Sequence, residues 1–242
     1  MNEIEQLHSH YLKSFGEAAT AFMVLPLAMA VIYRKNLTKP LKLVFLYLLI
    51  LFFYNFSESL FVWLVNTYTN FILPYLKKFN ISDTNFIAII GRLIDYIFVG
   101  WIFSYALKAP ISQWLKKVSW GLIPLAILVY FFVDGFRTYG TVNAIINRVY
   151  LVAVPALYFW HLFRSVPNLS LWRNSFFLFG LGIFIPSLIG LMMSFIGDKL
   201  NQTDYVAFVK LSIFRNVLTI LAQFVFAFAF YQAKYVKFLL RE

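Results

Sequence analysis

Seven apolar stretches occupy nearly all of this 242-residue chain, and each is long enough to cross a lipid bilayer as a helix. About 20 mostly apolar residues span the ~30 Å hydrocarbon layer, where a helix satisfies its own backbone hydrogen bonds. The predicted spans are residues 15–33, 43–66, 85–107, 118–133, 143–163, 174–196 and 208–232. The expected fold is an all-α integral membrane bundle of seven transmembrane helices, formed as one domain over residues 1–242.

The composition agrees with this class. Hydrophobic residues make up 62% of the chain and charged residues 13%, whereas a soluble domain has about half and about a quarter. The seven spans leave no room for a soluble catalytic or DNA-binding domain. The lipid bilayer is therefore the first expected partner, and the net charge of +11 does not indicate a nucleic-acid partner.

Basic residues gather in alternate connections between the spans. One set, which includes the C-terminal tail, holds twelve basic residues and one acid: Arg34, Lys35, Lys39, Lys42, Lys108, Lys116, Lys117, Arg164, Arg173, Lys234, Lys237, Arg241 and Glu242. In the other set, basic and acidic residues balance. Because Lys- and Arg-rich loops stay in the cytoplasm, the N-terminus is predicted outside and the C-terminus in the cytoplasm.

Two further features bear on shape. The longest outer connection, 67–84, contains an apolar run with two lysines, Phe71–Phe79, which is typical of a segment lying in the membrane interface. Prolines occur inside four of the spans, at Pro26, Pro124, Pro155 and Pro186. Each removes a backbone hydrogen bond and tends to kink its helix, either as a fixed shape or as a hinge.

Six ionisable residues fall within the predicted spans: Glu17, Glu58, Arg92, Asp95, Arg148 and Arg215. Charged groups cost a few kcal/mol or more at membrane depth, so they are expected to face the bundle interior, a wet cavity or one another. At a rise of about 1.5 Å per residue, all six are expected in the outer half of the membrane.

Polar neighbours extend these positions along the helix faces. Asn55 lies three residues before Glu58, and Gln223 follows Arg215 by two steps of four. The pattern predicts a polar pocket that opens outward and closes near mid-membrane. Its expected ligand-binding residues are Asn55, Glu58, Arg92, Asp95, Arg148, Arg215 and Gln223.

Three interpretations of these charges stay open. Three acids and three arginines could form neutral networks that only fix helix packing. Alternatively, guanidinium groups from three helices converge on a carboxylate or phosphate, which suits their planar geometry. The third interpretation is a proton or ion pathway through Asp95 and Glu58.

The run Arg92-Leu-Ile-Asp95-Tyr96 resembles the Arg-x-x-Asp-aromatic signature in the third helix of microbial rhodopsins. The retinal lysine of that family is missing, because the seventh span reads Thr219-Ile-Leu-Ala-Gln223 at the required depth, so no cofactor is expected. The layout also resembles small bacterial seven-helix membrane proteins of sensory type. This resemblance implies signalling and a multi-pass protein of the bacterial inner (plasma) membrane.

Enzyme signatures are missing from the chain. It has no His-Glu-x-x-His run, no adjacent Glu pair and no cysteine, so no catalytic residue or metal site is predicted. The expected function is receptor-like sensing of a small anionic or amphiphilic ligand from the outer side, with a cytoplasmic protein partner at the basic face. The alternatives are a small transporter or ion-coupled permease, an intramembrane lipid-modifying enzyme, and a scaffold subunit of a membrane complex.

Overall fold

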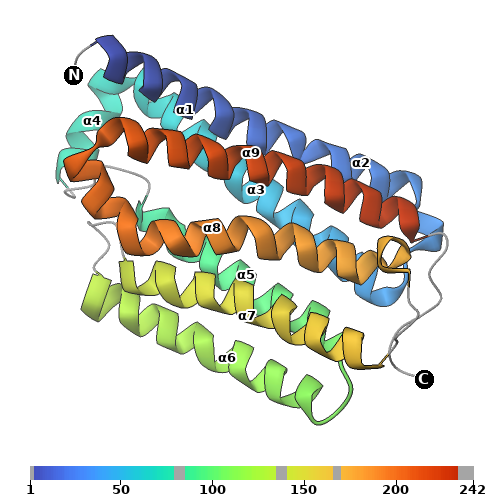
Figure 1. Ribbon diagram of the computed structural model, residues 1–242. Coiled ribbons are helices and arrows are strands. Elements are labelled where there is room, and N and C mark those ends of the chain that lie inside the picture. Colours follow the sequence, from blue (N-terminus) through green and yellow to red (C-terminus); the bar gives the residue numbers. More distant parts are fainter. Residues whose placement is uncertain (1–2, 79–84, 135–140, 166–169, 234–242) are drawn as a thin grey trace.

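The computed structural model describes residues 3–78, 85–134, 141–165 and 170–233. Every regular element in these ranges is a helix, and seven helical stretches are long and apolar enough to cross a membrane. Consecutive spans run in opposite directions through one bundle (Figure 1). The predicted all-α class and the number of spans are confirmed.

The helix bounds agree with the predicted spans to within a few residues at most ends. The first span consists of α1 (Glu3–Phe22) and α2 (Val24–Ile32). The others are α3 (Lys39–Thr67), α5 (Asn85–Ala106), α6 (Ile111–Val129) with the π-helical turn η2 (Tyr130–Asp134), α7 (Thr141–Ser165), α8 (Ser175–Thr203) and α9 (Tyr205–Gln232). Short elements connect them, namely η1 (Arg34–Asn36), α4 (Thr69–Lys78) and η3 (Leu171–Arg173).

The fourth span shows the largest difference at a predicted start, apart from the extension of α1. It was expected at 118–133, but α6 begins at Ile111. Hydropathy underestimates this helix because its first turns carry Lys116 and Lys117. Lysines at a helix end reach the water with their charged heads while their stems stay on apolar surface, so the helix continues past the apolar stretch.

One of the four span prolines coincides with a helix break. Pro26 has no N–H to bond the carbonyl of Phe22, the last residue of α1. The intervening Met23 amide bonds the Thr20 carbonyl at 3.2 Å in a tighter turn. Pro124, Pro155 and Pro186 lie inside continuous helices.

Polar side chains cap several of the helices. The side chain of Asn174 accepts hydrogen bonds from the amides of Phe176 and Phe177 at the start of α8, at 2.9 and 3.1 Å. At the start of α7, the carboxylate of Asp134 accepts from the amides of Val142 and Asn143 at 3.2 and 3.0 Å. These caps satisfy N–H groups that have no partner within their own helix.

Four rings from four spans form an aromatic layer, which we define as Phe103, Tyr158, Phe179 and Phe226. Phe103 on α5 lies 5.5 Å from Tyr158 on α7 and 5.9 Å from Phe179 on α8, between ring centroids. Phe179 in turn lies 5.4 Å from Phe226 on α9. The Phe226 ring lies directly against Gly182 of α8, where a Cβ would overlap it, so the glycine leaves the space that this ring occupies.

The predicted interfacial segment is a short helix, α4, directly after the second span. Phe71 and Tyr75 contact each other with ring centroids 5.8 Å apart, and they are 72% and 58% exposed. Residues 79–84 lie outside the described ranges.

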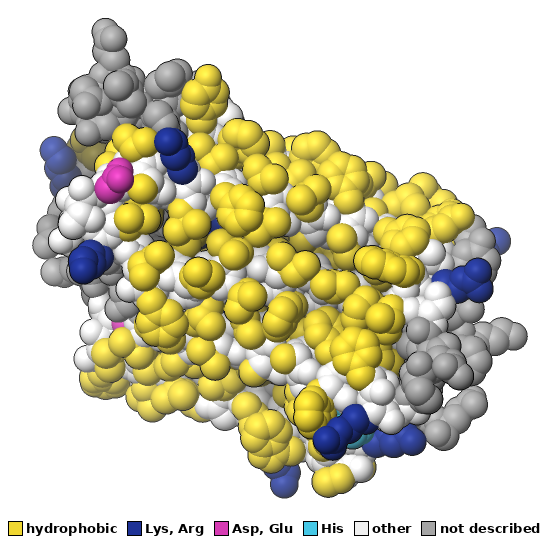
Figure 2. All heavy atoms as spheres, in the orientation of Figure 1, with side chains coloured by type: hydrophobic (Ala, Val, Ile, Leu, Met, Phe, Trp, Pro, Cys, Tyr) yellow, Lys and Arg dark blue, Asp and Glu magenta, His cyan; other side chains and the backbone are white. Residues whose placement is uncertain are grey.

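Charged side chains lie mainly at the two ends of the bundle, and apolar side chains cover the surface between them (Figure 2). One end gathers the basic connections between α2 and α3, α5 and α6, and α7 and α8 (Figure 1). Lys234, Lys237 and Arg241 lie outside the described residues. Helices of this length and hydropathy need a bilayer as solvent, so the chain is a multi-pass integral membrane protein.

Candidate functional site

Asp95 lies midway along α5 and connects three spans. Its Oδ1 accepts a hydrogen bond from the Tyr47 hydroxyl of α3 at 2.9 Å. Its Oδ2 accepts one from the Asn147 side-chain amide of α7 at 3.2 Å. Each carboxylate oxygen is therefore held by a different neighbouring helix.

Two arginines supply positive charge beside this carboxylate. Arg148 on α7 and Arg92 on α5 both interact electrostatically with Asp95, and the interaction of Arg148 is the stronger. The Arg148 side chain also lies against α8 at Gly190, where a Cβ would come within 3.0 Å of its Nε. The missing side chain at position 190 leaves room for the guanidinium group.

Tyr54 links Glu58 to the same group. Its ring packs on Gly91 of α5, 3.1 Å from the position of a Cβ. Its hydroxyl is close enough to Glu58, Arg92 and Asp95 for their charges to act on it. We refer to Tyr47, Tyr54, Glu58, Arg92, Asp95, Asn147 and Arg148 as the polar layer.

The sequence prediction placed four of these residues in the site, namely Glu58, Arg92, Asp95 and Arg148, and the structure brings them together. It did not include Asn147, nor the two tyrosines, Tyr47 and Tyr54. Their signal was present, since Tyr47, Tyr54 and Glu58 follow one another at steps of seven and four, which puts all three on one face of α3.

Asn55 lies apart from the polar layer. Its side-chain amide donates to the sulfur of Met23, at the break between α1 and α2, at 3.4 Å. Residues three apart on a helix differ by about 60° in direction. This difference is enough to turn Asn55 toward the first span while Glu58 interacts with Tyr54.

Arg215 lies on α9 at nearly the same depth as Arg148. Gly182 on α8 and Phe226 on α9 are in contact and lie equally far from the turn between these two antiparallel helices. Counting the same number of residues toward that turn along each helix, Gly190 on α8 lies level with Leu218 on α9. Arg215 is less than one helical turn from that level.

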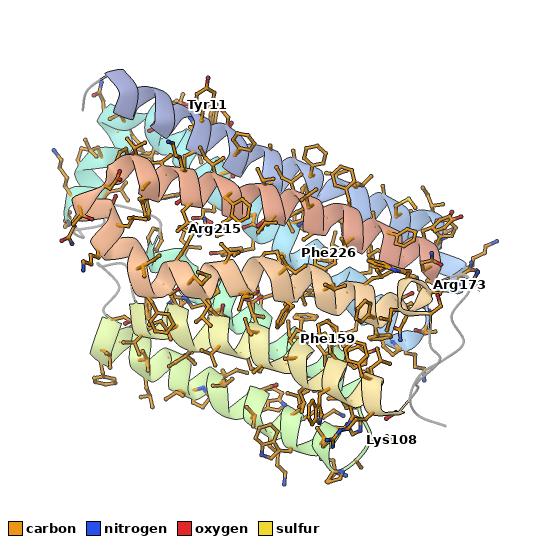
Figure 3. All side chains as sticks on the ribbon, viewed as in Figure 1. Tyr11, Lys108, Phe159, Arg173, Arg215 and Phe226 are labelled. Carbon is orange, nitrogen blue, oxygen red and sulfur yellow. The ribbon has the colours of Figure 1, made fainter. Side chains whose placement is uncertain are left out.

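The direction of Arg215 follows from the same helix geometry. It precedes Phe226 by about three turns, so both residues share the face of α9 that packs on α8. Figure 3 shows Arg215 between the ribbons of α9 and α8. Its Nη2 lies 3.4 Å from the Asn216 side-chain oxygen.

Gln223 is buried on α9, two turns beyond Arg215, with 4% of its surface exposed. Its side-chain oxygen has no hydrogen-bond partner among the described residues. The hydroxyl of Thr219, which lies between them, donates to the Arg215 carbonyl at 3.0 Å. The assignment of Gln223 to the site stays a prediction, whereas the Thr219 hydroxyl is bonded within its own helix.

Glu17 does not join the interior charges. Its carboxylate lies 3.9 Å from the Lys13 ammonium, and both side chains are more than 60% exposed, at 62% and 64%. The interpretation in which three acids pair with three arginines therefore does not hold for Glu17. Of the six ionisable residues predicted within the spans, the five that remain are three arginines (Arg92, Arg148 and Arg215) and two acids (Glu58 and Asp95), which leaves one formal positive charge in excess.

In the described ranges, no three His, Asp or Glu side chains come together as a metal site. The site is thus a network of guanidinium, carboxylate, phenol and amide groups. No protein-family model, no curated protein and no solved structure matches the chain.

Proposed function

We propose that this protein is a receptor-like sensor that binds a small anionic or amphiphilic ligand at the polar layer. The observation that carries the proposal is that Arg92 and Arg148, from two helices, lie near enough to Asp95 for their charges to act on it, in the middle of α5. The likeness of the layout to bacterial sensory seven-helix proteins supports it. We place the protein in the bacterial inner membrane, with the basic end in the cytoplasm and the ligand entering from the outer side.

The two arginines are the groups that would contact the ligand. Both oxygens of Asp95 already accept hydrogen bonds, from Tyr47 and Asn147, so this carboxylate orients the arginines rather than binding a ligand itself. Guanidinium groups present paired N–H donors that match a carboxylate or phosphate. The excess positive charge of the interior set also favours an anion over a cation.

The same hydrogen bonds suggest how binding is transmitted. Asp95 joins α3, α5 and α7, so a ligand that draws Arg148 away from it changes the balance of contacts among three helices. A ligand shifts such an equilibrium only by its differential affinity for the two arrangements. The shift would be read by a cytoplasmic protein partner at the basic end.

The aromatic layer favours sensing over transport. Its four rings are at most 6% exposed and pack against one another across α5, α7, α8 and α9. A transporter or permease would need a path past these rings. A sensor needs only the changed positions of the helices to reach the other end.

Binding of alkyl phosphates and alkyl carboxylates of graded chain length to purified protein tests the proposal. Arg92→Gln and Arg148→Gln should each weaken the affinity at least tenfold, because each removes a guanidinium from the ligand. Lys210→Gln is the matched control, since Lys210 is an exposed cation on α9. Folding of each variant is checked by gel filtration and thermal unfolding.

Two results would contradict the proposal. The first is that no alkyl phosphate or carboxylate binds, or that all three folded variants bind alike. The second is net uptake of the bound anion into proteoliposomes, which would make the protein a transporter. Binding without uptake supports a sensor.

A further inference from the structure

A lysine lies among aromatic rings at the basic end of the bundle, at the junction of α5 and α6. The Lys116 ammonium is 5.7 Å from the ring centroid of Trp101 and 5.7 Å from that of Tyr105, both on α5. Trp120 follows Lys116 by one turn and shares its side of α6. The labelled Lys108 in Figure 3 marks this end of the two helices.

The rings leave the ammonium able to bind an anion. A ring face attracts a cation but offers no strong hydrogen-bond acceptor, so the three N–H donors of the amine are not used by Trp101 or Tyr105. In the part of the chain that the structure describes, no carboxylate forms an ion pair with Lys116. The site thus holds an uncompensated positive charge in a fixed aromatic setting.

The position of this group suits the head-group region of a membrane. Lys116 lies about 7.5 Å along α6 from its first residue, Ile111. Trp101 and Trp120 are 36% and 57% exposed, and aromatic side chains collect where head groups meet acyl chains. More than half of the Trp120 side chain is exposed, so its ring is open to an acyl chain.

We propose that Trp101, Tyr105, Lys116 and Trp120 form a binding site for an anionic phospholipid. The ammonium pairs with the lipid phosphate, and the rings pack on the glycerol and the first carbons of the acyl chain. This site is separate from the polar layer and does not depend on the function proposed for it. Free phosphate shares the charge but not the apolar contacts, so the two sources can be told apart.

The adjacent lysine offers a matched control. Lys117 is exposed, with no aromatic ring contact among the described residues. Native mass spectrometry of the full chain, loaded with equal amounts of phosphatidylglycerol and phosphatidylcholine, measures the lipids retained. We expect Lys116→Gln to lower retained phosphatidylglycerol at least fivefold and Lys117→Gln to change it less than twofold. Lys116→Arg should keep most of the lipid, and 10 mM inorganic phosphate should not displace it.

A second substitution keeps the test decisive if Lys116→Gln does not fold. Trp120→Ala retains the charge and removes a ring, so retained phosphatidylglycerol should fall two- to threefold. Equal losses in the Lys116 and Lys117 variants would overturn the proposal, since they would indicate general attraction to a basic surface. Equal retention of both lipids, displacement by phosphate, or unchanged retention in the Trp120 variant would overturn it as well.

Discussion

The aromatic layer and the polar layer both join α5 and α7 to neighbouring helices, yet their side chains differ in exposure and in the kind of contact they make. The four rings of the aromatic layer are 0–6% exposed and make close, non-directional contacts. The charged residues of the polar layer are all partly exposed and depend on hydrogen bonds with a required geometry.

This difference separates two tasks. Displacing close-packed rings breaks their stabilising van der Waals contacts, so these rings hold the helices in one arrangement. In a charged network, the side chains can exchange hydrogen-bond and charge partners, so the network rearranges when a charged ligand is added. We therefore expect substitutions in the aromatic layer to act mainly on stability, and those in the polar layer to act on ligand binding as well.

The largest expected effect on stability is in the aromatic layer. Phe179→Ala removes ring contacts with Tyr47, Phe103 and Phe226, and should lower the free energy of unfolding by about 3–5 kcal/mol. Phe228→Ala is the control, because this ring is 40% exposed on the outer face. Equilibrium unfolding in mixed micelles measures both variants. Similar losses would show that the aromatic layer has no special role.

The next effect concerns Asp95. Asp95→Ala removes the acceptor of the Tyr47 and Asn147 hydrogen bonds, and should cost about 3 kcal/mol because two interior donors lose their partner. Glu17→Ala removes an exposed pair and should cost less than about 1 kcal/mol. The same unfolding measurement compares them, and a loss at Glu17 as large as at Asp95 would contradict the assignment of Asp95 as the centre.

The smallest effect on stability, and the sharpest separation of the two tasks, is expected at Gly190. Gly190→Ala places a Cβ within 3.0 Å of the Arg148 Nε, so the guanidinium must shift. Stability should change by about 1 kcal/mol, whereas anion affinity should fall several-fold. Gly121→Ala is the matched control, since its Cβ meets nothing within 4 Å. Unchanged affinity in the Gly190 variant would indicate that Arg148 does not contact the ligand.

Much of the fold could be predicted because each span carries its own signal. The start of α6 could not be predicted in this way, because Lys116 and Lys117 lower the local hydropathy. Both lysines still belong to the helix, since long side chains can carry their charged heads toward water. The sequence does not distinguish among the four prolines within the spans, Pro26, Pro124, Pro155 and Pro186. Only the packed structure shows that the helix breaks at the first of them.

The candidate site was predictable in part. A buried charge needs compensation, which led to Arg92, Asp95 and Arg148, but the compensating partner cannot be read from the charge itself. Glu17 pairs with Lys13 on its own helix, and Asn55 donates a hydrogen bond to the sulfur of Met23. Tyr47 shares a face of α3 with Glu58 but was not predicted, because a phenol in an apolar run carries no charge that needs a partner.

By itself, the sequence determined that this chain forms seven membrane-length helices, with its basic residues in alternate connections. The physical reason is local, since the cost of placing a peptide segment in hydrocarbon depends on the length and polarity of that segment alone. Only the tertiary structure decided that Tyr47 and Asn147 bond to Asp95, with Arg148 near enough for its charge to act on the carboxylate. The rotation of each helix and its choice of neighbours depend on how all the spans pack together, and no single segment contains that information.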